Sequence, residues 1–197
     1  MQDARNAVTA FVLAGGKSTR MGSDKAFVLL NGQTLLERAL DTVRAITPQV
    51  MIVGARSKFS TYAPVVEDIF LDRGPLGGIH AALMASATDL NLLLAVDLPF
   101  VEPSFLTYIC NRARESDAAV VVPHAAGGWQ PLCAVYRQEF GTLAEKALAA
   151  GRNKIDGLFA GVPVVSIVEP EITQAGFSLD IFRNINTREE LEEADRT

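Results

Sequence analysis

Short apolar runs alternate along the chain with segments in which apolar residues recur at helical spacing. The first run, Ala7–Leu13, is apolar almost throughout, as expected of a strand that is buried on both faces of a sheet. The run Leu90–Val96 has the same character. Further strands are predicted at 50–55, 118–123, 131–136 and 162–168. This alternation predicts an α/β fold with a mostly parallel sheet.

Two of the predicted helices begin at a capping box. Thr34 and Glu37 have capping-box spacing ahead of an amphipathic stretch, and Thr187 and Glu190 repeat that spacing ahead of REELEEAD. Other helices are predicted at 76–87, 104–115 and 138–149. Because no repeat, low-complexity linker or shift in composition interrupts the pattern, we expect one domain over residues 1–197.

Composition and charge narrow the class of protein. Of the 197 residues, 49% are hydrophobic and 21% are charged, which excludes a disordered or fibrous chain. The net charge is −5 and no block of basic residues occurs, so we expect binding neither to nucleic acid nor to a membrane surface. No apolar stretch approaches the roughly 20 residues that span a bilayer, and MQDARNAV lacks a signal-peptide apolar region. We therefore expect a cytoplasmic protein.

The cysteines and histidines indicate no metal centre of their own. Cys110 and Cys133 lie in apolar runs, which favours reduced core thiols over a disulfide framework. His80 and His124 are the only histidines, and no zinc-ligand spacing fits them.

A glycine-rich and basic segment, LAGGKSTRMGSDK, follows the first predicted strand. In open α/β sheets, ligands bind where strands end. Gly15 and Gly16 allow a sharp turn with backbone N–H groups free to bind phosphate oxygens. Lys17, Arg20 and Lys25 add positive charge suited to a triphosphate. The plainer alternative is a flexible surface loop with solvated charges.

Two familiar phosphate-binding motifs are excluded for this segment. A P-loop would need glycine five positions before Gly16, where Phe11 stands. The dinucleotide spacing G-x-G-x-x-G is also absent.

The segment resembles the signature of nucleotidyltransferases with a GT-A-like fold, and most closely that of molybdenum cofactor guanylyltransferases. The likeness continues in order along nearly the whole chain through Glu67-Asp68, Gly74-Pro75-Leu76 with Gly78, Asp97-Leu98-Pro99-Phe100, Trp129-Gln130-Pro131-Leu132 with Ala134-Val135-Tyr136, and Asn184-Ile185-Asn186-Thr187. The resemblance implies a three-layer, Rossmann-like sheet flanked by helices. It also implies transfer of GMP from GTP to the terminal phosphate of molybdopterin, with release of pyrophosphate.

The resemblance assigns roles residue by residue. It implies a nucleotide site formed by Leu13, Ala14, Gly15, Gly16, Lys25, Gly54, Asp68, Gly78 and Asp97. The catalytic residues would be Arg20, Lys25 and Asp97, with the two cations neutralising the pyrophosphate. Asp97 and Asn186 would hold Mg²⁺, which usually takes one or two carboxylates.

Plainer interpretations of these positions stay open. Asp97 precedes Leu98-Pro99 and also fits a turn aspartate, while Asp68 has a rival in Asp72, and both fit a solvated loop. Where Gly54 stands, the family often carries an asparagine that helps to hold the nucleotide. Gly54 is therefore expected in the site only through a backbone contact that replaces this side chain, and the choice of base stays open.

The acceptor is anionic, so a second basic site is expected. Arg152 and Lys154 are the main candidates, with Asn184 beside them and Arg137 and Arg183 as further possibilities. No general base is needed, because a phosphate monoester is already mostly dianionic at pH 7.

Two other functions remain as alternatives. A sister enzyme would use CTP to make molybdopterin cytosine dinucleotide, although such relatives usually carry alanine where this chain has Gly15. A nucleotide-binding protein of the same fold without catalysis would have no need of Lys25 and Asp97. The small-molecule partners implied by the resemblance are GTP and molybdopterin. Transient contacts with cofactor-biosynthesis proteins and molybdoenzyme acceptors are implied as well.

Overall fold

The computed structural model describes residues 7–15 and 24–194. Within these residues, the strands and helices predicted above are present, with ends within two residues of the predicted bounds. Gly16 and Arg20, two residues of the expected site, lie outside the described part of the chain.

The central sheet is mostly parallel, as predicted. Its strands run in the order β10-β7-β9-β6-β1-β4-β5, and β9 is antiparallel to both of its neighbours. The bounds are β1 (Val8–Leu13), β4 (Val50–Val53), β5 (Val65–Val66), β6 (Leu90–Ala95), β7 (Val120–Ala125), β9 (Cys133–Arg137) and β10 (Val164–Val168). The short strand β8 (Gly128–Trp129) pairs with β7, and β2 (Leu29–Leu30) pairs with β3 (Gln33–Thr34) in a separate hairpin.

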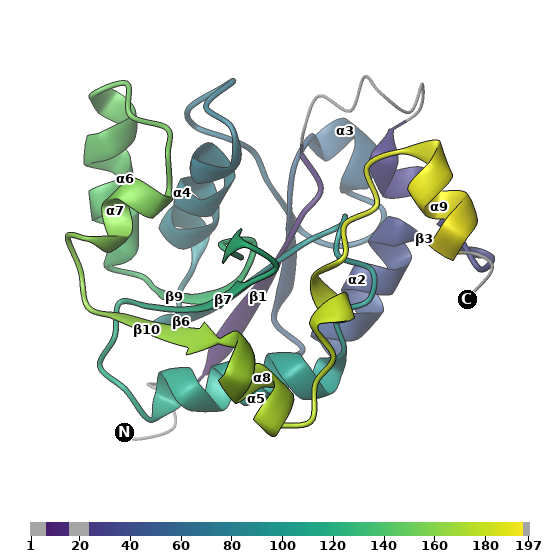
Figure 1. Cartoon of the computed structure of the whole chain (residues 1–197). Helices are drawn as coiled ribbons and strands as arrows, with labels where there is room; N and C mark the ends of the chain where they lie inside the picture. Colours follow the sequence, from purple (N-terminus) through teal and green to yellow (C-terminus); the bar gives the residue numbers. More distant parts are fainter. Residues whose placement is uncertain (1–6, 16–23, 195–197) are drawn as a thin grey trace.

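Helices cover both faces of the sheet and make three layers (Figure 1). One face packs against α2 (Leu35–Arg44), α3 (Arg56–Phe59), α5 (Pro103–Arg114) and α8 (Glu169–Gln174). The other packs against α4 (Pro75–Ala85), α6 (Phe140–Ala149) and α7 (Asp156–Phe159). The remaining helical segments are the 3₁₀ turns η1 (Lys25–Phe27) and η2 (Leu179–Phe182), and α9 (Arg188–Ala194).

Strand β1 shows why the apolar runs have no polar alternation. Ala10 and Val12 pack into the core on the side of α2 and α5, whereas Phe11 and Leu13 pack into the core on the side of α4 and α6. All four residues are buried. A strand covered on both faces has no solvated face, so apolar residues stand on both of its sides, and its one polar residue, Thr9, is hydrogen-bonded to Thr88.

The two predicted capping boxes are both formed. Thr34 Oγ1 accepts a hydrogen bond from the Glu37 N–H at 3.2 Å, and Glu37 accepts one from the Thr34 N–H at 3.0 Å. Thr187 Oγ1 accepts from the Glu190 N–H at 3.2 Å, and Glu190 accepts from the Thr187 N–H at 2.9 Å.

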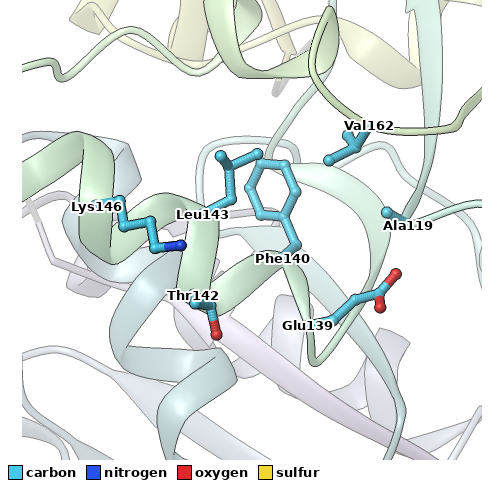
Figure 2. Close-up of a pocket in the computed structure, with 7 residues that line it drawn as sticks. All are labelled: Ala119, Glu139, Phe140, Thr142, Leu143, Lys146 and Val162. Atoms are coloured by element: carbon cyan, nitrogen blue, oxygen red, sulfur yellow. The ribbon is translucent and has the colours of Figure 1, made fainter.

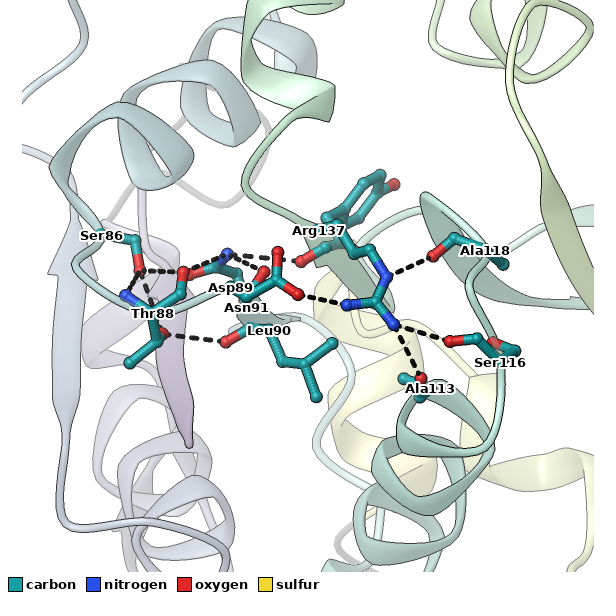
Figure 3. A network of polar contacts seen from close by, with 10 residues as sticks. Ser86, Thr88, Asp89, Leu90, Asn91, Ala113, Ser116, Ala118 and Arg137 are labelled. Carbon is teal, nitrogen blue, oxygen red and sulfur yellow. Dashed lines mark hydrogen bonds and ion pairs between the residues drawn. The ribbon is translucent and has the colours of Figure 1, made fainter. Parts of the chain in front are cut away.

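A network of polar contacts lies at the amino end of β6 (Figure 3). The Arg137 guanidinium is paired with the Asp89 carboxylate and donates to the carbonyls of Ala113, Ser116 and Ala118. These contacts tie β9 to the end of α5, so the role of Arg137 here is structural.

No helix in the described part of the chain combines the length and the apolar character that crossing a membrane requires.

Candidate active site

The expected site residues gather where the parallel strands β1 and β6 end. Strand β1 lies between β4 and β6. After β1 the chain adds β4 and β5 on one side of it and then returns to add β6 on the other side, so the strand order reverses at β1. Open α/β sheets bind ligands in the crevice at such a point. Leu13, Ala14 and Gly15 stand at the end of β1, and Asp97 stands two residues beyond the end of β6.

Lys25 lies at the centre of this cluster. Its Nζ donates to Asp97 Oδ2 at 2.9 Å and to Asn186 Oδ1 at 2.7 Å. The lysine side chain is 13% exposed and the aspartate side chain 29% exposed. The structure thus brings together three residues, from three distant parts of the sequence, that were predicted to share one site.

The backbone holds this cluster in place. The Ile185 N–H donates to the Asp97 carbonyl at 3.1 Å, which fixes the segment carrying Asn184 and Asn186 beside the strand end. Asp24 precedes Lys25 and caps η1 by accepting from the Ala26 N–H at 3.3 Å. It also pairs with Lys58 Nζ at 2.6 Å, and this second cation was not predicted from the sequence.

The Glu190 carboxylate contacts the backbone of Asn186. Its Oε2 accepts from the Asn186 N–H at 2.6 Å as well as from the Thr187 N–H. The hydrogen bond from Asn186 is the largest of the effects that hold the pKa of Glu190 below its ordinary value. The carboxylate is therefore well supplied with donors at the base of the cluster.

Asp68 lies on the other side of β1, beside the first turn of α4. A Cβ added to Gly78 would be 3.2 Å from Leu13 Cδ2 and 3.8 Å from Asp68 Oδ1, so these three residues form one close-packed group. Asp68 Oδ1 is buried and has no hydrogen-bond partner among the described residues, and burial raises the pKa of this carboxyl group. Its rival, Asp72, is exposed in a turn with φ of 59°. The geometry favours Asp68 as a ligand-binding carboxylate.

The backbone of Gly54 is already engaged in the sheet. Its N–H donates to the Val66 carbonyl at 2.9 Å, and the Ala14 N–H donates to the Val53 carbonyl at 3.0 Å. Any backbone contact from Gly54 to a nucleotide must therefore use its carbonyl. The Phe59 ring fills the space where a side chain at position 54 would begin.

A hollow of about 200 Å³ adjoins Asp97 on the β9 side of β1, whereas Gly54 lies on the β4 side. It is lined by Pro75, Asp97, Leu98, Gln130, Pro131, Leu132, Ile155 and Asn184. Arg152 and Lys154 are exposed on the segment between α6 and α7 that leads to Ile155, and neither lines the hollow. Gln130 and Ile155 were not predicted as site residues, although Gln130 belongs to the motif WQPL.

Two other basic residues considered for the acceptor are engaged elsewhere. Arg137 lies at the amino end of β6, roughly 20 Å from Asp97 at about 3.3 Å per strand residue. It is therefore excluded as an acceptor-binding residue. The Arg183 guanidinium lies over the Phe100 ring, 5.4 Å from its centre, and pairs with Glu193.

A second hollow, of about 310 Å³, lies along α6 (Figure 2). It is lined by Ala119, Glu139, Phe140, Thr142, Leu143, Lys146 and Val162. None of these is a predicted site residue, and the smaller hollow contains Asp97. Of the two hollows, only the smaller one is lined by residues of the expected site, namely Asp97 and Asn184.

Asp97 and Asn186 suit a magnesium ion in their donor chemistry. Both present oxygen atoms, and both oxygens lie within 2.9 Å of the same Lys25 nitrogen, so they already face one positive centre. Magnesium prefers oxygen donors and few protein carboxylates. Among the described residues, no cluster of three or more histidine, cysteine, aspartate or glutamate side chains offers another metal site.

Known proteins resemble this chain in sequence and in fold. The chain is 36% identical over 193 residues to a protein named molybdenum cofactor guanylyltransferase from Desulfosudis oleivorans, covering 96% of this chain and 95% of that one. It is 33% identical to a probable molybdenum cofactor guanylyltransferase from Flavobacterium johnsoniae, covering 93% and 94%. The crystal structure of molybdopterin-guanine dinucleotide biosynthesis protein A from Archaeoglobus fulgidus superposes with a TM-score of 0.84 at 28% identity, covering 95% and 97%.

The three-layer fold and the cluster at its strand ends define the chain as a nucleotidyltransferase of the GT-A-like class. Residues 10–162 match the family model of the MobA-like NTP transferase domain. The chain belongs to the MobA-like NTP transferase family.

Proposed function

We propose that this protein, acting as a single domain, transfers GMP from GTP to the terminal phosphate of molybdopterin. The products are pyrophosphate and molybdopterin guanine dinucleotide. The relatives named molybdenum cofactor guanylyltransferase support this reaction through their 33–36% identity over nearly the whole chain. The observation that carries the proposal is the contact of Lys25 with both Asp97 and Asn186 beside the end of β1.

The reaction is an in-line substitution at the α-phosphorus of GTP. An oxygen of the molybdopterin phosphate forms the new bond, and the bond to pyrophosphate breaks. Since the attacking phosphate is mostly dianionic at pH 7, no side chain has to remove a proton from it. What the protein must supply is positioning and neutralisation of negative charge.

The residues of the cluster meet that requirement. Lys25 places an ammonium group, held by two oxygens and 13% exposed, where it can approach the phosphates of a nucleotide bound at the end of β1. In a site with little water, such a charge acts more strongly than in bulk solvent. Arg20, outside the described residues, is proposed to add a second cation. Asp97 and Asn186 would hold Mg²⁺, which when bound supplies positive charge to the phosphate oxygens.

Recognition of the base is proposed to involve Asp68. A guanine edge offers two N–H donors, and a carboxylate can accept both. Within residues 7–15 and 24–194, no group donates a hydrogen bond to the buried Asp68 Oδ1, as expected of an acceptor that awaits a ligand. Leu13, Gly54 and Gly78 are proposed to lie beside the bound nucleotide, and a Cβ at Gly78 would press against Leu13 Cδ2 at 3.2 Å.

The acceptor is proposed to occupy the hollow beside Asp97. Asn184 and Gln130 offer amide groups to it, and Arg152 and Lys154 add positive charge near its rim. We further propose a cytoplasmic location, which the free and buried Cys110 and Cys133 support. Transient contacts with other proteins of cofactor synthesis and with molybdoenzymes belong to the same proposal.

Thermal unfolding with Mg²⁺ and GTP, CTP, ATP or UTP at matched concentrations tests the nucleotide. A ligand at a hundredfold excess over its Kd stabilises the native state by about 2.7 kcal/mol. We expect a shift with GTP, and its loss in Lys25→Ala. Lys146→Ala, which removes a lysine from the hollow along α6, is the matched control and should keep the shift.

Pyrophosphate release then tests the acceptor. With molybdopterin present, release from GTP supports the proposal, and release from CTP alone would assign the chain to the sister cytidylyl reaction. Binding of GTP without any turnover would indicate a nucleotide-binding protein that is not catalytic.

A further inference from the structure

We propose that Glu190 is a positioning residue for Lys25 and acts through Asn186. This inference rests on the proposed function of Lys25 at the phosphates. The sequence spacing assigns Glu190 only to the capping box of α9, but the structure gives its carboxylate a second task.

The contacts form a continuous path of three hydrogen bonds. Glu190 Oε2 accepts from the Asn186 N–H at 2.6 Å, which is shorter than its bond to the Thr187 N–H at 2.9 Å. The Asn186 side chain then accepts from Lys25 Nζ at 2.7 Å, and Lys25 Nζ also donates to Asp97 at 2.9 Å. The path therefore runs from the first turn of α9 to the centre of the cluster.

The surroundings of Asn186 make this support necessary. Asn186 is exposed, and it lies in a segment without regular structure between η2 and α9. The adjacent residue Ile185 is anchored through its N–H to the Asp97 carbonyl and is fully buried. Glu190 supplies the corresponding anchor for the backbone of Asn186. Without it, the asparagine side chain can leave Lys25, and the ammonium keeps only Asp97.

The two residues of this capping box have different roles. Thr187 Oγ1 caps the Glu190 N–H and takes no part in the path from Glu190 to Lys25. Removing Thr187 Oγ1 or the Glu190 carboxylate weakens the start of α9 to a similar degree. Only the loss of the carboxylate releases the Asn186 N–H.

The test compares Glu190→Ala with Thr187→Ala in turnover of GTP with molybdopterin. Both variants should melt a few degrees below the parent protein. We expect kcat to fall about tenfold in Glu190→Ala, as is typical when a supporting hydrogen bond to a ligand-binding residue is lost, and to stay within about twofold in Thr187→Ala. The KM for GTP should change less than kcat, because Gly15, Asp68 and Asp97 are untouched. Equal kcat in the two variants would overturn the inference.

Two further variants define how Glu190 acts. Glu190→Gln keeps an oxygen that can accept the Asn186 N–H and should recover most of the lost turnover. Failure to recover would show that an accepted hydrogen bond is not the basis of the effect. Glu189→Gln removes an equal charge from an exposed side chain of the same helix and should leave kcat unchanged. A loss as large as in Glu190→Ala would indicate a charge effect of the whole helix instead.

A measurement without substrates separates this inference from the proposed function. The ¹⁵N-labelled ammonium signal of Lys25, assigned through Lys25→Arg, reports its hydrogen bonds directly. It should broaden through solvent exchange in Glu190→Ala and persist in Thr187→Ala. An unchanged signal in Glu190→Ala refutes the positioning role, whether or not the protein turns over GTP. Absence of turnover in the parent protein refutes the proposed function alone.

Discussion

Replacing Gly54 by alanine should destabilise the protein through one identifiable contact. A Cβ at this position would lie 2.7 Å from Phe59 Cε2 and 2.9 Å from Cδ2, about 0.7 Å inside ordinary contact distance at the closer atom. The Phe59 ring is fully buried and packs 5.7 Å from the Phe27 ring, so it cannot simply swing into solvent. The φ of Gly54 lies outside the left-handed region, so backbone strain adds nothing.

The expected magnitude follows from overpacking. An extra methyl group forced into a packed core costs about 1–3 kcal/mol, and the lower entropy of unfolded alanine returns about 0.4–1 kcal/mol. We expect a net loss of about 1–2 kcal/mol in the free energy of unfolding. For a chain of this size, that lowers Tm by roughly 2–8 °C. Urea unfolding and thermal melting both measure it.

Two controls make this prediction specific. Gly128→Ala places a methyl group where no atom of the described part of the chain lies within 4 Å, and the φ of Gly128 is also outside the left-handed region, so the stability of this variant should be unchanged or slightly higher. Phe59→Leu removes the clashing ring atoms, and in that background Gly54→Ala should cost much less. If Gly54→Ala behaves like Gly128→Ala, or costs the same in the Phe59→Leu background as with the native ring, the packing argument is wrong.

Three further predictions concern Asp68, Arg137 and the magnesium ion. Because burial raises the pKa of Asp68, its folded state favours the protonated form, so its contribution to stability should grow as pH falls from neutral toward about pH 4. Asp68→Asn should therefore raise Tm at pH 7, flatten this part of the pH profile and weaken GTP binding by calorimetry. Arg137→Ala should lower the free energy of unfolding by roughly 3 kcal/mol in urea, since it removes a donor from three carbonyls and from Asp89, yet leave the KM for GTP unchanged. Chelation of Mg²⁺ should abolish pyrophosphate release reversibly, and in Asp97→Asn turnover should require a much higher Mg²⁺ concentration.

The long elements of the fold were predictable because their signals are local. The apolar runs at β1 and β6 and the capping box at Thr34 identify strands and a helix within a few residues. The antiparallel direction of β9 was not predictable, since the direction of a strand depends on its neighbours and not on its own sequence. The hairpin of β2 and β3 was missed, although Asn31-Gly32 is a strong two-residue turn signal and both residues have positive φ.

Some features of the candidate site were likewise predictable from the sequence, and others were not. The position of Asp97 at a strand end, and that of the glycine segment at another, follow from the expected parallel sheet. The contact between Lys25 and Asn186 joins residues 161 positions apart, and only the family resemblance suggested it. The second role of Glu190 and the contact of Phe59 with Gly54 were invisible, because each depends on how separate elements pack. The short helices α3 and α7 contain too few residues for a helical period to be recognised.

The span of the Lys25–Asn186 contact also has a consequence for the order of folding. The strands β1, β4 and β6 can assemble from the first half of the chain, but the ammonium acquires its second oxygen only after residue 186 has been synthesised and docked. Contacts between such distant residues close late, because the entropy of a long loop must be overcome first. A growing chain therefore has a largely formed sheet before it has a complete site.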